Sequence, residues 1–236
     1  MSGWKAKRFW SEATVAEHAG GYTVQLDSRS VKTPAKALLV VPTRAMATAI
    51  ADEWGAVDGT VDPRAMPVTR SANAAIDKVA PQFAEVAEIV AAYGASDLLC
   101  YRDANSDALS ERQARAWDPM LDWAAATYGA RLEKTRGIIP VPQPEASLRA
   151  LNAAVLGTTA FQLTALHDLV SLSGSLVLGL AATDSRFDIS TLWASSRIDE
   201  DWQAEHWGED EQAVASAASK RGEFEHARRF WTLSVE

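Results

Sequence analysis

A long apolar run in the second half of the chain is the strongest constraint on its fold. Between residues 161 and 181, large apolar side chains recur at helical spacing, and additional leucines leave little polar surface; the main stripe is Leu166, Leu169, Val170, Val177 and Leu180. A helix that is apolar nearly all round is stable in water only when other helices cover it. We therefore expect residues 161–181 to form the central helix of a bundle. The uncharged part, residues 169–183, is shorter than the roughly 20 residues that cross a bilayer, so we expect no membrane insertion.

The first forty residues have the pattern of short strands instead. Two runs that favour β-structure, residues 14–17 and 22–26, flank Gly20-Gly21. This arrangement predicts a hairpin, because glycine accepts the positive φ that such turns require. A turn at residues 27–30, a short strand at 31–34 and another at 38–41 would complete an antiparallel sheet over residues 8–42.

Helical spacing begins after Thr43, a plausible N-cap. The predicted helical regions are residues 45–54, 71–93 with Pro81 as a candidate break, 107–128, 189–206 and 209–233. The expected fold class is therefore α+β. A small antiparallel β-rich N-terminal domain with one helix would cover residues 1–70, and a helical C-terminal domain would cover residues 71–236.

Composition and missing motifs exclude several classes of function. A net charge of −8 argues against a nucleic-acid partner, and a single cysteine excludes a disulfide framework. No glycine-rich phosphate loop is present, and the four histidines are far apart, so we expect no cofactor, no metal and no catalytic residues. The basic residues 1–8 have no apolar run behind them, so we expect no secretory signal and a cytoplasmic protein.

An acidic segment near the C-terminus is the most unusual local feature. Residues 198–211 contain seven acidic side chains and no lysine or arginine. One interpretation is a solvated face whose last three acids begin the next helix, where the helix dipole favours them. The other is a partner surface, because an aromatic ring beside charged groups is typical of an interface anchor. The candidate partner-binding residues are Asp199, Glu200, Gln203, Trp207, Gly208 and Asp210.

Read together with stretches further upstream, this segment resembles the family of assembly chaperones that bind the α subunit of the ATP synthase catalytic head (the Atp-twelve type). The matching stretches follow one another along nearly the whole chain: Arg8-Phe9-Trp10, residues 24–29, Lys32-Thr33-Pro34, Glu53-Trp54, residues 66–69, Ala75-Ile76-Asp77, Tyr93, Asp97-Leu98-Leu99, Tyr101-Arg102, Gln113, Trp117-Asp118-Pro119, and Glu200 and Gln203 with residues 207–210. One departure is Ser28, where the family often has glycine between Asp and Arg.

The resemblance implies a non-enzymatic chaperone that holds the new α subunit and shields the surface that later meets β subunits. It implies a β-rich N-terminal domain, a helical C-terminal domain, and a client contact around Glu200. A member without a mitochondrial presequence would be bacterial and cytoplasmic. We expect the free protein to be a monomer.

Two alternatives stay open: a small-molecule enzyme that uses carboxylates of the helical domain, and a homo-oligomer whose tryptophan-rich surface is its own interface. Of the nine tryptophans, we expect Trp117, Trp123 and Trp193 to be buried and Trp207 to meet a partner.

Overall fold

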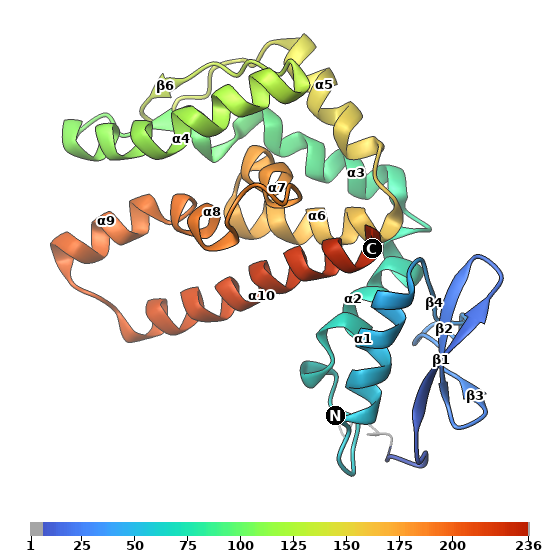
Figure 1. Cartoon of the computed structure of the whole chain (residues 1–236). Coiled ribbons are helices and arrows are strands. Elements are labelled where there is room, and N and C mark those ends of the chain that lie inside the picture. The colour runs from blue at the N-terminus through green and yellow to red at the C-terminus, as the bar shows by residue number, and fades with distance from the viewer. Residues whose placement is uncertain (1–6, 236) are drawn as a thin grey trace. The chain divides into compact units, whose positions relative to one another are not determined.

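The computed structural model describes residues 7–235, and its helices and strands are labelled in Figure 1. The predicted α+β class is confirmed, because a small sheet near the N-terminus is followed by a chain that is mainly helical. The described residues form two compact units. One unit contains the described part of Met1–Phe83 with Thr159–Ala165 and Arg229–Glu236, and the other contains Ala84–Thr158 and Leu166–Arg228. The domain boundary between residues 70 and 71 stays a prediction.

Over residues 7–235, no helix combines the length and the apolar character that a membrane span requires. Residues 1–6, which include Lys5 of the basic N-terminal segment, lie outside the described part of the chain.

The predicted hairpin is confirmed. Strands β1 (Ala13–His18) and β2 (Gly21–Leu26) are antiparallel and meet at Gly20 and Gly21, whose φ angles are +88° and +151°. A Cβ on Gly21 would overlap the carbonyl oxygen of Val41, so β4 (Val40–Val41) also requires glycine here. Strand β2 pairs with both β3 (Arg29–Ser30) and β4.

The predicted third strand, residues 31–34, is wrong in position. The paired residues are Arg29 and Ser30, and Lys32 makes only an isolated bridge with Leu38. A tight turn replaces the strand, because the Lys36 amide donates to the Thr33 carbonyl oxygen over 2.9 Å. This turn interrupts the ladder between residues 33 and 36.

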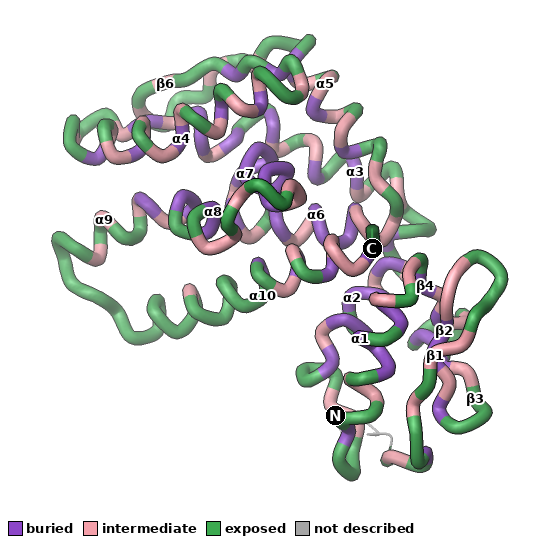
Figure 2. Tube along the Cα trace, viewed as in Figure 1, coloured by how far each residue is buried: buried purple, intermediate pink, exposed green. Residues whose placement is uncertain are grey.

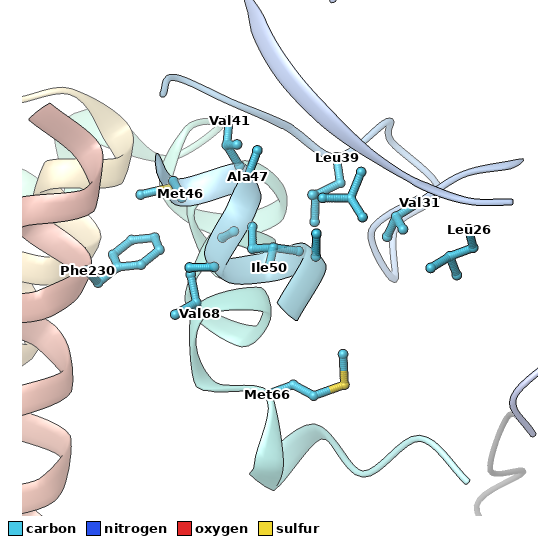
Figure 3. Close-up of a cluster of buried hydrophobic side chains, with 14 of the residues drawn as sticks. Leu26, Val31, Leu39, Val41, Met46, Ala47, Ile50, Met66, Val68 and Phe230 are labelled. Carbon is cyan, nitrogen blue, oxygen red and sulfur yellow. The ribbon is translucent and has the colours of Figure 1, made fainter. Parts of the chain in front are cut away.

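Helix α1 (Arg44–Gly55) packs against this sheet, with Thr43 as its predicted N-cap: the Thr43 hydroxyl oxygen accepts from the Met46 amide over 3.1 Å. The short turn η1 (Pro63–Ala65) follows. The next helix, α2 (Pro67–Ala74), begins four residues before the predicted start at 71 and continues as a π-helix, η2 (Ala75–Val79). Figure 3 shows the core of this unit, where Leu39, Met46, Ile50 and Phe230 are fully buried.

The other unit is built mainly from elements that begin at residue 83 or later. Their bounds, with those of the short turns and strands, are α3 (Phe83–Ala92), η3 (Tyr93–Ser96), η4 (Leu98–Cys100), β5 (Tyr101–Arg102), α4 (Asp107–Tyr128), β6 (Thr135–Arg136), α5 (Glu145–Leu156), α6 (Ala160–Ser173), α7 (Leu176–Ala182), α8 (Ile189–Ser195), α9 (Ile198–Trp207) and α10 (Glu211–Val235). Helices α6 and α10 each contribute residues to both units. The helix predicted for residues 107–128 is confirmed.

The apolar run is buried as predicted, but it forms two helices rather than one. Gly174 has a φ of +71°, and the Ser175 hydroxyl oxygen then accepts from the Leu178 amide as the N-cap of α7. All seven residues of α7 are buried, so the centre of the bundle is this short helix together with one side of α6.

The helix predicted for residues 189–206 is also two helices, α8 and α9. The Ser196 hydroxyl donates to the Trp193 carbonyl oxygen over 2.7 Å, and the Ser196 amide donates to the carbonyl oxygens of Leu192 and Trp193. Serine side chains that bond to nearby carbonyls compete with the regular helix ladder. Arg197, with a ψ of 7°, is not in the regular helical conformation, and the separate helix α9 begins at Ile198.

Candidate functional site

The most exposed helical segment of the described chain is the end of α9, its connection to α10, and the first turns of α10. We call residues 199–218 the α9–α10 surface. Ile198 is the buried residue of α9, and every residue from Glu205 to Ser216 is exposed (Figure 2). A helical segment that buries so little of itself is free to contact another molecule.

Helix α4 holds α9 in place through two polar contacts. The Gln113 Nε2 atom donates to the Asp199 Oδ1 atom over 2.6 Å, and the Gln113 Oε1 atom accepts from the Asp103 amide over 2.8 Å. Nearly two turns further along α9, the Arg112 Nη1 atom lies 2.8 and 2.7 Å from the two carboxylate oxygens of Glu205. Gln113 is only 2% exposed, so its amide is part of the interior, and Asp199 faces α4.

Glu200 and Gln203 are accessible. A Glu200 carboxylate oxygen lies 2.6 Å from the Arg197 Nη1 atom, and about half of the Glu200 side chain is exposed. The Arg197 guanidinium in turn lies 5.8 Å from the centre of the buried Trp193 ring, and this contact holds the arginine of the pair in place. Gln203 is exposed on the next turn.

Trp207 ends α9 and is 78% exposed. The centre of the His206 ring lies 4.2 Å from the centre of the Trp202 ring and 6.1 Å from the centre of the Trp207 ring. Gly208 follows with a φ of +90°, a conformation that side chains rarely adopt, and it lets the chain turn out of α9. Such a large exposed aromatic ring is the kind of side chain that dominates binding energy at protein interfaces.

The carboxylates around Trp207 give this surface a negative potential. Asp201, Glu209 and Glu211 make no ion pair with the residues that the structure describes, and the Asp210 Oδ1 atom accepts from the Gln212 amide near the start of α10. No group of three or more His, Cys, Asp or Glu side chains in the described chain could hold a metal ion. The arrangement is suited to contacting a partner surface that combines apolar and basic groups.

The structure thus separates the six predicted site residues into two groups. Glu200, Gln203, Trp207, Gly208 and Asp210 are exposed, whereas Asp199 is half-buried and contacts α4. Their role in binding stays a prediction. Sequence reasoning did not find the Arg112–Glu205 pair, because 93 residues separate its members. It also passed over Val214, which is 48% exposed among small residues of α10.

The predicted burial of Trp117 and Trp193 is confirmed, whereas Trp123 is less buried than predicted. Trp117 and Trp193 are buried, and the Trp117 Nε1 atom donates to the Ser195 carbonyl oxygen over 2.8 Å. Trp123 is half-buried and makes edge contacts with Phe187 and Tyr128. Trp207 is exposed, as its predicted contact with a partner requires.

Comparisons with known proteins agree with one another. A family model described as ATP12 chaperone protein matches residues 7–125. The structure of Atp12 from Paracoccus denitrificans is similar with a TM-score of 0.95 and 52% identity, over 97% of this chain and 98% of that one. The structure of the Atu1473 protein from Agrobacterium tumefaciens is similar with a TM-score of 0.92 and 39% sequence identity, over 98% of this chain and 87% of that one.

A curated relative extends the comparison beyond bacteria. The mitochondrial atp12 protein of Schizosaccharomyces pombe is 23% identical over 219 residues, which cover 88% of this chain and 75% of that protein. The chain therefore belongs to the ATP12 chaperone protein family.

Proposed function

We propose that this protein is an assembly chaperone of the ATP synthase catalytic head, and that it binds the α subunit and shields its apolar interface until β subunits replace the chaperone. Membership of the chaperone family and the ordered resemblance along the chain support this function. The same proposal describes a cytoplasmic protein that is monomeric when free and carries no catalytic residues.

The observation that carries the proposal is the α9–α10 surface. It presents Trp207 and Val214 to solvent, surrounds them with carboxylates, and is anchored at its base by the contacts of Asp199 and Glu205 with α4. A fixed base with a free aromatic tip provides a binding surface whose shape is set before the client arrives, which reduces the entropy lost on binding.

The experiment compares capture of purified α subunit by wild type and three variants. Glu200→Lys places a cation in the acidic surface, and we expect at least tenfold weaker binding, or about 1.4 kcal/mol. Trp207→Ala removes the exposed ring, for which we expect a loss of about 2 kcal/mol or more. Isothermal titration or surface plasmon resonance gives the dissociation constants.

Glu145→Lys is the matched control. Like Glu200, Glu145 is a glutamate in the first turn of its helix that pairs with an arginine, here Arg149. Each of the two substitutions removes an acidic residue from the first turn of a helix and breaks one ion pair with arginine. Equal losses of affinity for the α subunit would therefore show that α9 has no special role in binding the client. The fourth protein, wild type, must bind α; if it does not, the proposed client is wrong.

Sedimentation of the free protein tests the homo-oligomer alternative, in which the exposed Trp207 ring would contact a second copy of the chain. A dimer that Trp207→Ala dissociates would assign this surface to self-association and would contradict the proposal.

A further inference from the structure

A pocket in the N-terminal unit has a different chemistry from the α9–α10 surface. It has a volume of about 490 Å³ and lies among the loop after β3, the end of α1 and the segment from η1 to η2. Its walls are mainly apolar and include Pro34, Trp54, Val61 and Met66. This volume lies within the range of about 300–1,000 Å³ that is typical of ligand sites.

The charged side chains that line the pocket are mostly cationic. Lys32 and Lys36 come from the loop, and Arg70 and Lys78 come from α2 and η2. The one carboxylate of the lining, Asp77, is already engaged, because its two oxygens accept from the Thr33 hydroxyl over 2.6 Å and from the Ala35 amide over 3.0 Å. A chain with a net charge of −8 therefore has a positive rim around an apolar pocket.

Two uncommon backbone features form this rim. Lys36 has a φ of +72°, a left-handed conformation that is unfavourable for residues other than glycine, asparagine and aspartate. On the opposite side, α2 continues into the π-helix η2, which carries Asp77 and Lys78, and π-helical turns occur frequently at functional sites. The contacts of Asp77 with the loop join the two sides.

We propose that this pocket binds a short extended segment of a client protein, in which an apolar side chain enters the pocket and flanking carboxylates contact the lysines of the rim. Cations on both sides of the pocket match acidic residues on both sides of the apolar one. The inference rests on the proposed function only in taking a protein segment as the occupant. The residues that line the pocket all lie within residues 7–125, the part that the family model matches.

Trp54 makes this binding measurable. It lines the pocket, and its Nε1 atom has no hydrogen-bond partner in the described structure, so its indole resonance should respond to an occupant. Full-length protein labelled with ¹⁵N-tryptophan is titrated with blocked hexapeptides, and Trp54→Phe assigns the signal. The first peptide is Asp-Glu-Leu-Leu-Glu-Asp; the second replaces its acids with lysine, and the third replaces its leucines with glycine.

We expect the first peptide to shift the Trp54 signal with at least tenfold tighter binding than the other two. Lys36→Glu and Lys78→Glu should each weaken that binding several-fold, whereas Lys220→Glu, a charge reversal of an exposed lysine on α10, should leave it unchanged. Thermal unfolding of each variant verifies that the fold is retained.

Three results would overturn the inference: no shift of Trp54, equal binding of the lysine peptide, or equal binding of the glycine peptide, which would indicate attraction of any anion. Capture of α subunit by the same preparations separates the two proposals. Normal capture without peptide binding would refute the pocket alone, and peptide binding without capture would refute the proposed client alone.

Discussion

Gln113→Leu is the substitution that most sharply tests how the candidate site is positioned. Gln113 is buried in α4 and joins the Asp199 carboxylate, at 2.6 Å, to the Asp103 amide, at 2.8 Å. Leucine has nearly the same size but can make neither hydrogen bond. The substitution therefore leaves a half-buried carboxylate and a half-buried amide without their protein partner, while the packing volume stays similar.

The expected destabilisation is the sum of two losses. A hydrogen bond to a charged group contributes about 1.5–3 kcal/mol, and a buried amide without a partner costs about 1–3 kcal/mol. Both Asp103 and Asp199 are half-buried, so water compensates in part and the lower ends of these ranges apply. We expect the free energy of unfolding to fall by about 2.5 kcal/mol.

Urea denaturation followed by tryptophan fluorescence measures this change, and a double-mutant cycle isolates the contact. Asp199→Asn keeps the acceptor oxygen and removes the charge, so we expect a smaller loss, about 1 kcal/mol. The coupling between Gln113→Leu and Asp199→Asn should be about 1 kcal/mol, as is found for residues in direct contact. A loss below about 0.5 kcal/mol for Gln113→Leu, with additive effects, would refute the reasoning that Asp199 anchors α9.

Three further predictions concern the helical unit. Gly179→Ala should lower the free energy of unfolding by about 2–3 kcal/mol in the same assay, because a Cβ there would overlap the Val170 side chain on α6; an unchanged stability would contradict this packing. Partial burial tends to raise the pKa of Asp118, but hydrogen bonds from Arg102 and a lysine outweigh it and hold this pKa below its usual value. The ionised Asp118 carboxylate therefore stabilises the fold above about pH 4, and this stabilisation is lost as the pH falls through the lowered pKa. The stability difference between wild type and Asp118→Asn should therefore shrink in acid, and a difference independent of pH would refute the assignment. Burial raises the pKa of the Cys100 thiol to about 12, so iodoacetamide should label it only after unfolding; rapid labelling of the native protein, read by mass spectrometry, would contradict its burial.

Local patterns predicted much of the fold. The hairpin around Gly20-Gly21, the cap at Thr43 and the helix 107–128 follow from signals within a few residues, and all three are confirmed. The two broken helices were predicted as continuous because their breaks have weak signals. At residues 173–175 the serine cap and the glycine lie inside an apolar stretch, and at Ser196 neither glycine nor proline marks the break.

Long-range packing could not be predicted in the same way. Phe230 near the C-terminus and Ala165 in α6 belong to the core of the N-terminal unit, and no spacing rule connects them with Met46 or Ile50. The candidate surface was predictable because its acids and Trp207 are neighbours in sequence. The contacts that fix it, from Arg112 and Gln113 to α9, depend on how α4 packs.

Hydrogen–deuterium exchange of the complex with α subunit tests the central claim most directly. Residues 199–218 bury few side chains in the free protein, so this segment should open locally and its amides should exchange early. The proposal requires that these amides become protected when α binds. We expect slower exchange in peptides that cover the end of α9 and the first turns of α10, with little change in α5, where Glu145 lies. Protection confined to other segments, with residues 199–218 exchanging as in the free protein, would contradict the assignment of the client surface.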